Sequence, residues 1–170
     1  MARDRDRLRR WREAWTTATA RAQEAGAGAS IAAQGALFRY DEALDAPLPP
    51  TGDYRCRMFK LGAKSRGMID YIAYPWFTCR VAREGQVMSL TKRTGSQRQV
   101  GLIFAAEPRR AVFLGTLMLG DETRTIEYGR DDARDVAGWV ERVGSARWRV
   151  AMPFPAFEST LDVMEMVPAR

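Results

Sequence analysis

The fold is decided by a stretch of alternating character, Asp53-Tyr-Arg-Cys-Arg-Met-Phe-Lys-Leu61. Cys56 and its apolar second neighbours share one face of an extended strand, and arginines occupy the opposite face. The same alternation surrounds the second cysteine, in Tyr74-Pro-Trp-Phe-Thr-Cys-Arg-Val81. Each cysteine therefore lies on the inward face of a strand, which predicts an all-β core. From these residues alone, the only two cysteines of the chain are either reduced thiols or partners in one disulfide.

Segments with a period of two continue to the end of the chain. Strands are predicted at 53–61, 70–81, 86–92, 98–105, 110–119, 124–128, 136–142, 147–152 and 161–167. Turn-forming residues separate them, and short connections favour pairing between sequential strands. We therefore expect a mainly β (α+β) protein with a lipocalin-like antiparallel meander β-barrel, and a β-sandwich is the alternative. Segment 136–142 also fits a helix, but a strand is preferred there.

The N-terminal part of the chain predicts a helical arm. Apolar residues recur at three- and four-residue steps over 4–25, and this stripe contains Trp11 and Trp15. Ser30 is the expected N-cap of a shorter helix that runs from Ile31 to about Phe38.

The expected organisation has three parts. They are a helical arm at 1–46 packed on the barrel, a proline-rich spacer at 47–52 and the β-barrel domain at 53–170. The apolar strand at 112–119 has few polar residues on either face, so we expect the tryptophan stripe of the arm to cover its outer face.

Composition narrows the range of functions. The chain carries a formal charge of +6, but its arginines are interleaved with acids along the whole sequence, so no nucleic acid partner is expected. No apolar run approaches the roughly 20 residues that a membrane span requires. The absence of histidine excludes a Ser-His-Asp triad and histidine-ligated zinc. No cofactor, metal site or catalytic residue is predicted, because phosphate-binding glycine loops and dinucleotide fingerprints are also missing.

Several motifs resemble those of a known family. They are Gly52-Asp-Tyr-Arg-Cys-Arg57, Tyr74-Pro-Trp-Phe-Thr-Cys-Arg80, Thr94-Gly-Ser-Gln-Arg98, Phe113-Leu-Gly-Thr-Leu117 and Asp135-Val-Ala-Gly138. In this order the chain resembles the uncharacterised bacterial domain-of-unknown-function family 4893, found mainly in proteobacteria, over most of its length. The resemblance implies neither an activity nor site residues.

The same resemblance has implications for location. Many members of the family look like exported proteins, which implies a periplasmic or secreted protein whose signal peptide is missing from this sequence. A disulfide between Cys56 and Cys79 is then expected. A cytoplasmic protein with reduced thiols is the alternative.

Loops and strand ends supply the candidate ligand-binding residues. The hydroxyls, amide and guanidinium of Thr94-Gly-Ser-Gln-Arg98 are groups that hold a phosphate or carboxylate, although a plain hairpin turn also explains this motif. Tyr74-Pro-Trp-Phe77 and Met152-Pro-Phe-Pro155 are expected at the rim of an open barrel. The candidate ligand-binding residues are Tyr74, Trp76, Ser96, Gln97, Arg98, Trp148 and Glu158.

These observations favour a non-enzymatic exported binding module that carries a small apolar or acidic ligand in its barrel. The alternative is a protein-interaction, inhibitor or envelope scaffold with a filled barrel. A hydrolase that uses carboxylates is less favoured, because it needs two carboxylates that face one cleft, and the sequence alone does not place them. An oligonucleotide-binding barrel ranks last.

Overall fold

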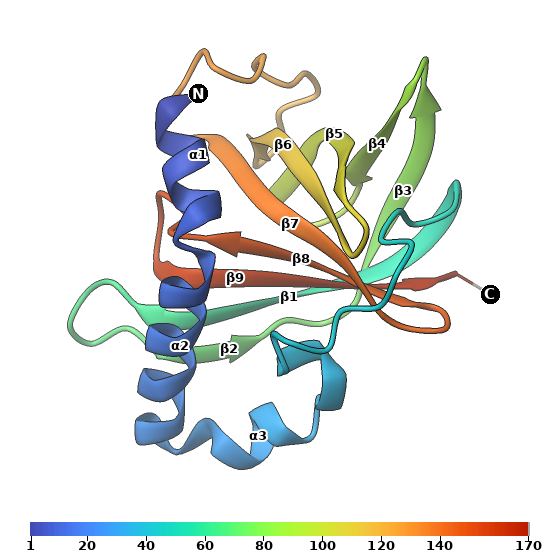
Figure 1. Cartoon of the computed structure of the whole chain (residues 1–170). Coiled ribbons are helices and arrows are strands. Elements are labelled where there is room, and N and C mark those ends of the chain that lie inside the picture. The colour runs from blue at the N-terminus through green and yellow to red at the C-terminus, as the bar shows by residue number, and fades with distance from the viewer. Residues whose placement is uncertain (170) are drawn as a thin grey trace.

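The computed structural model describes residues 1–169. They form a closed antiparallel barrel of eight strands, one additional short strand and an N-terminal helical region that lies along one side of the barrel (Figure 1). The predicted antiparallel meander barrel with a helical arm is therefore confirmed, in place of the sandwich alternative.

The barrel closes between its first and last strands. Each strand from β3 to β8 pairs with the next, and β9 returns to pair with β1 along most of its length. β1 also pairs with β3 through its first half and with the short β2 through its second half. The strands are β1 (Gly52–Ala63), β2 (Tyr71–Ala73), β3 (Phe77–Glu84), β4 (Val87–Lys92), β5 (Gln97–Glu107), β6 (Arg110–Leu119), β7 (Asp135–Gly144), β8 (Arg147–Pro153) and β9 (Ser159–Pro168).

Two predicted strands differ from the structure. Segment 70–81 is interrupted at residues 74–76, because Pro75 has no N–H to donate to a ladder. Residues 124–128 form no strand and belong to the connection between β6 and β7. Ile126 instead lines a shallow apolar groove with Leu102 and Leu114 on the outer face of the barrel. Its apolar character therefore reflects packing against the sheet, which the alternation cannot distinguish from strand pairing. Segment 136–142 is a strand, as preferred.

The helices are shorter than expected. They are α1 (Ala2–Arg9), α2 (Trp11–Ala22) and α3 (Gly28–Ala32), with irregular turns η1 (Gln23–Ala27) and η2 (Gly35–Phe38). The predicted helix at 4–25 is broken at Arg10, and Gly26, with φ of 90°, ends its regular course. Ser30 lies inside α3, so its predicted role as N-cap is wrong. No helix within residues 1–169 combines the length and apolar character that crossing a bilayer needs.

The helical arm packs across β1, β7, β8 and β9 (Figure 1). The prediction that it covers 112–119 is wrong, because the outward residues of β1 and β9 are the apolar ones. Phe59 and Leu161 from these strands join Trp11 and Trp15 in one buried cluster. The outward faces of β1 and β9 therefore contribute apolar side chains to the contact with the arm.

A buried arginine fastens the arm to the barrel. Arg149 of β8 is completely buried, and its Nε donates a 2.6 Å hydrogen bond to Oε2 of Glu141. Its Nη1 donates to the backbone carbonyls of Ala36, Leu37 and Arg39. The guanidinium charge is therefore compensated by a carboxylate and by the backbone of the arm itself.

Cys56 and Cys79 form a disulfide that joins β1 to β3, as the family resemblance implied. Their Cα atoms are 5.9 Å apart, and 23 positions separate them in sequence. Both side chains are buried in the apolar core inside the barrel. The bond therefore ties the strand that closes the barrel to its neighbour.

Replacing both cysteines, Cys56→Ala with Cys79→Ala, is expected to lower the free energy of unfolding by about 3 kcal/mol, because a loop of this length gains entropy in the unfolded chain. Guanidinium unfolding of the oxidised protein and of the double variant measures the difference. Adding reductant during unfolding should destabilise only the protein that has its cysteines. A difference below about 1 kcal/mol would contradict a stabilising role for the disulfide.

Candidate ligand site at one end of the barrel

The interior of the barrel is apolar at one end and polar at the other. Along β1, the inward positions run from Tyr54 and Cys56 through Met58 to Lys60. The first three belong to the apolar core, whereas Lys60 faces a group of polar side chains from other strands. The change from filled core to polar site therefore takes place within one strand.

A cavity of about 260 Å³ lies at the polar end. Its volume is just below the roughly 300–1,000 Å³ of pockets that hold drug-sized ligands, so it suits a smaller molecule. The residues around it comprise buried side chains at the base, half-buried ones on the walls and an exposed serine at the rim. They are Met58, Lys60, Lys92 and Gln99, then Tyr74, Phe77, Gln97 and Glu158, and finally Ser96.

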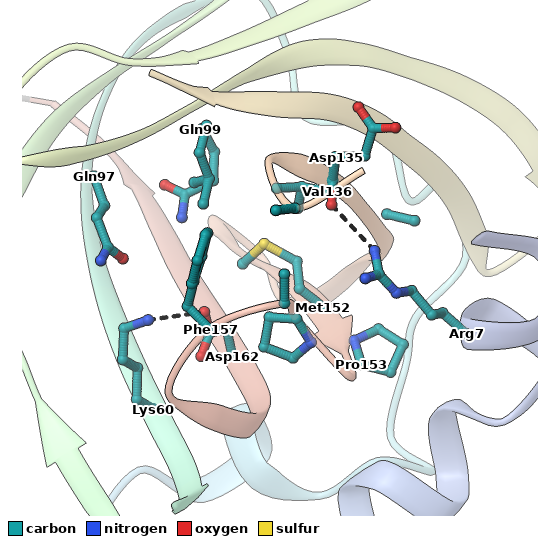
Figure 2. Close-up of a pocket in the computed structure, with 15 residues that line it drawn as sticks. Arg7, Lys60, Gln97, Gln99, Asp135, Val136, Met152, Pro153, Phe157 and Asp162 are labelled. Atoms are coloured by element: carbon teal, nitrogen blue, oxygen red, sulfur yellow. Dashed lines mark hydrogen bonds and ion pairs between the residues drawn. The ribbon is translucent and has the colours of Figure 1, made fainter. Parts of the chain in front are cut away.

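A second, smaller pocket adjoins this cavity and shares Lys60, Gln97 and Gln99 with it. Figure 2 shows the side chain of Phe157 among these residues, between Gln99 and the ion pair of Lys60 with Asp162. The space left there is about 20 Å³, enough for about one water molecule. A ligand larger than a water molecule therefore has to occupy the larger cavity.

Lys60 is held by two carboxylates. Its Nζ lies 3.2 Å from Oδ2 of Asp162 and 3.0 Å from Oε2 of Glu158. The hydroxyl of Ser159 donates to the other oxygen of Asp162. Burial opposes the charge of Lys60, but the two carboxylates outweigh it and raise the pKa of Lys60 above its usual value. Lys60 therefore stays charged, and its partners are carboxylates of the protein itself.

Lys92 is in a different position. Only 2% of its surface is exposed, and its Nζ donates a 2.7 Å hydrogen bond to the carbonyl of Gln97. The same nitrogen lies 3.8 Å from the centre of the Phe77 ring. No carboxylate within residues 1–169 forms an ion pair with Lys92. Burial, with the positive charges of Arg98 and Lys60, lowers the pKa of Lys92 to about 8.

The turn between β4 and β5 holds Lys92 in place. Gly95 has φ of 93°, and a Cβ at this position would lie 2.8 Å from Nζ of Lys92 and 2.9 Å from the ring of Phe77. A larger residue is therefore excluded by both conformation and space. The motif Thr94–Arg98 is a hairpin turn, as its plainer interpretation held, and it also packs against the buried amine.

Gln99 adds a hydrogen-bond acceptor without a partner. Its side chain is buried, and its Oε1 accepts no hydrogen bond from any residue that the structure describes. Leaving such an atom unpaired costs about 1–3 kcal/mol. The cavity therefore combines an unpaired cation with an unpaired acceptor, both of which a bound molecule can satisfy.

Residues 1–166 match the family described as "Domain of unknown function (DUF4893)". The chain belongs to this family. The membership implied by the motifs is thus confirmed. No curated protein and no solved structure matches the chain. The geometry of the cavity is consequently the basis on which a function is argued.

Four of the predicted ligand-binding residues meet at the cavity. Tyr74 reaches it from the connection between β2 and β3, Ser96 from the β4–β5 turn, Gln97 from the start of β5, and Glu158 from the connection between β8 and β9. Their common position supports the choice of strand ends as a source of site residues. Their role in binding stays a prediction.

Two other predicted residues lie away from the cavity. Arg98 points outward, where its Nη2 donates to the carbonyls of Gly120 and Glu122 and fastens the β6–β7 connection. Trp148 is buried at the filled end of the barrel, with its ring centre 6.0 Å from that of Tyr54. The contacts of Arg98 with the β6–β7 connection and of Trp148 with the core explain both residues without a ligand.

Trp76 is also outside the cavity. It is partly exposed on the outer surface, where the guanidinium groups of Arg55 and Arg57 lie 4.9 Å and 4.7 Å from its ring centre. Proline at position 75 turns the chain between β2 and β3, so Tyr74 and Trp76 face different sides.

The sequence analysis missed the buried polar residues Lys60, Lys92 and Gln99. A signal for the lysines was present, because Lys60 shares the inward positions of Cys56 and Lys92 those of Leu90. The chain has only three lysines, and two of them hold inward positions on strands. A lysine on the apolar face of a strand is therefore a usable indicator of a polar interior.

The substitution Lys92→Met is expected to stabilise the protein by about 2 to 3 kcal/mol at pH 6.5, because it removes a buried unpaired charge. The folded-state pKa of Lys92, about 8, is below that of the unfolded chain. The destabilisation is therefore fully present below pH 8 and disappears as the pH rises toward 10. Guanidinium unfolding at pH 6.5 and pH 9.5 measures both values.

Lys64→Met provides the matched control, because Lys64 is the remaining lysine and is exposed. It should change the free energy of unfolding by less than about 0.5 kcal/mol at either pH. A Lys92→Met variant that is less stable than the unmodified protein at pH 6.5 would contradict the assignment of Lys92 as an unpaired buried charge.

Proposed function

We propose that the protein is a non-enzymatic binding module that carries a small acidic ligand in the polar end of its barrel. The observation that carries this proposal is the buried ammonium group of Lys92, which borders a cavity and has no carboxylate partner within residues 1–169. A ligand carboxylate supplies the missing negative charge and accepts a charge-assisted hydrogen bond. Binding removes the cost of burying the lysine alone.

The rest of the cavity describes the ligand further. Phe77 and Met58 offer apolar contacts, so the body of the ligand is apolar or aromatic. The unpaired Oε1 of Gln99 accepts a hydrogen bond from a hydroxyl or amine on the ligand. A short hydroxylated carboxylic acid satisfies all of these groups. Glu158 lines the same cavity, and its carboxylate is held by the ammonium group of Lys60, 3.0 Å away.

The proposal includes a periplasmic or secreted location. The disulfide between Cys56 and Cys79 supports it, because such bonds persist in oxidising compartments.

A protein-interaction scaffold is the second candidate. It is favoured by Met68 and Ile69, which are exposed in the connection between β1 and β2, and by the apolar filling of most of the barrel. A partner that binds through this connection would leave the cavity free.

Binding is tested by titration calorimetry with a series of short carboxylic acids, with and without a hydroxyl group, and with the matched primary amides. We expect one acid to bind per chain, and its amide to bind at least about tenfold more weakly, because the charged hydrogen bond to Lys92 is lost. Lys92→Met should weaken binding of the acid by a similar factor.

Lys64→Met is again the matched control and should bind the acid unchanged. A Lys92→Met variant that retains the affinity of the unmodified protein would contradict the proposal. So would acids and amides that bind equally. If no acid binds but a truncation of the β1–β2 connection abolishes association with a protein partner, the second candidate is supported in its place.

A further inference from the structure

We propose that Lys92 captures small carbonyl compounds covalently, as an imine formed inside the barrel cavity. This reaction goes beyond the proposed function, because it uses the neutral amine of Lys92, whereas acid binding uses the ammonium ion. The ligand class is a small aldehyde or ketone that fits within about 260 Å³.

The side chain of Lys92 is placed where a small molecule in the cavity meets it. Lys92 lines the cavity, and the one hydrogen bond of its Nζ goes to the carbonyl of Gln97. The lysine nitrogen has further hydrogen-bonding positions, and no carboxylate of residues 1–169 occupies one of them. By contrast, Lys60 in the same cavity is bound to both Asp162 and Glu158. Of the two lysines that line the cavity, Lys92 is therefore the one whose amine has no carboxylate partner to block a carbonyl compound.

The amine of Lys92 is more often neutral than that of an ordinary lysine. With the pKa of Lys92 lowered to about 8, about a tenth of the side chains are neutral at pH 7, against less than about 0.1% for an ordinary lysine. The charged groups near this amine are Arg98 of β5 and Lys60 of β1, which both favour its neutral form. The carboxylates of Asp162 and Glu158 pair with Lys60, and neither forms an ion pair with Lys92.

The reaction needs no further reagent. The nitrogen lone pair attacks the carbonyl carbon and forms a C–N bond, which gives a carbinolamine. The C–O bond then breaks, the oxygen leaves as water with the two amine protons, and a C=N bond remains. Tyr74, Ser96 and Glu158 line the cavity and provide the groups that transfer protons between nitrogen and oxygen. Hydrolysis reverses the step and releases the ligand.

The test is reductive trapping with propanal and cyanoborohydride at pH 7, followed by peptide mapping at several times. The three lysines and the N-terminal amine are quantified separately in the unmodified protein, so no variant has to fold. Burial lowers the pKa of Lys64 as well, but less than that of Lys92. We therefore expect Lys92 to be labelled at least about tenfold faster than Lys64, because a larger fraction of its amine is neutral. Paired Lys60 should be the slowest lysine.

Labelling of Lys92 no faster than Lys64 would overturn the inference. Equal labelling in folded protein and in guanidinium would overturn it as well, because the cavity would then have no effect. The two proposals fail separately. If Lys92 is labelled selectively but no carboxylic acid binds, the inference stands and the proposed function is wrong. If an acid binds without selective labelling, only the inference is wrong.

Discussion

The pairing of β1 with β9 is the constraint on which the remaining structure depends. It closes the barrel and fixes which side chains of β1 face inward. Those side chains begin with Tyr54 and Cys56 in the apolar core and end with Lys60 at the cavity. The same pairing places Asp162 of β9 opposite Lys60, so the ion pair at the base of the cavity is a direct product of closure. A slip of one residue would exchange the inner and outer faces of both strands.

Two buried cations of this fold differ in how far the protein compensates their charge. Arg149 faces the helical arm and donates to Glu141 and to three backbone carbonyls. Lys92 faces the cavity and donates to the carbonyl of Gln97 alone. Both side chains have lost their hydration, but the protein compensates only the first. The uncompensated charge is a cost to stability that is understandable where a ligand provides the compensation.

The alternation of residues predicted antiparallel strands around one core, because each strand buries one face inside; it favoured a barrel over a sandwich, and a strand over a helix at 136–142, without excluding the alternatives. It could not place 124–128, whose apolar side chains pack against the sheet without joining it. It also could not identify which strands the arm covers, because that depends on a contact between distant parts of the chain. Part of the site was predictable from strand ends, as Glu158 illustrates. Lys92 was missed, although its register with Leu90 marks it as inward-facing; that it has no carboxylate partner depends on the opposite wall of the barrel, which the local pattern does not show.

The closed barrel has a consequence for the order in which the chain folds. Cys56 and Cys79 lie on neighbouring strands, whereas Lys60 and Asp162 are about a hundred residues apart and meet only when β9 has been added. Local pairings form sooner than distant ones, because less chain entropy is lost. After closure, both sulfur atoms are enclosed by the core and beyond the reach of an oxidising enzyme. An external oxidant therefore reaches these sulfur atoms only while the sheet is open, and the cavity beside Lys60 is among the last features to be completed.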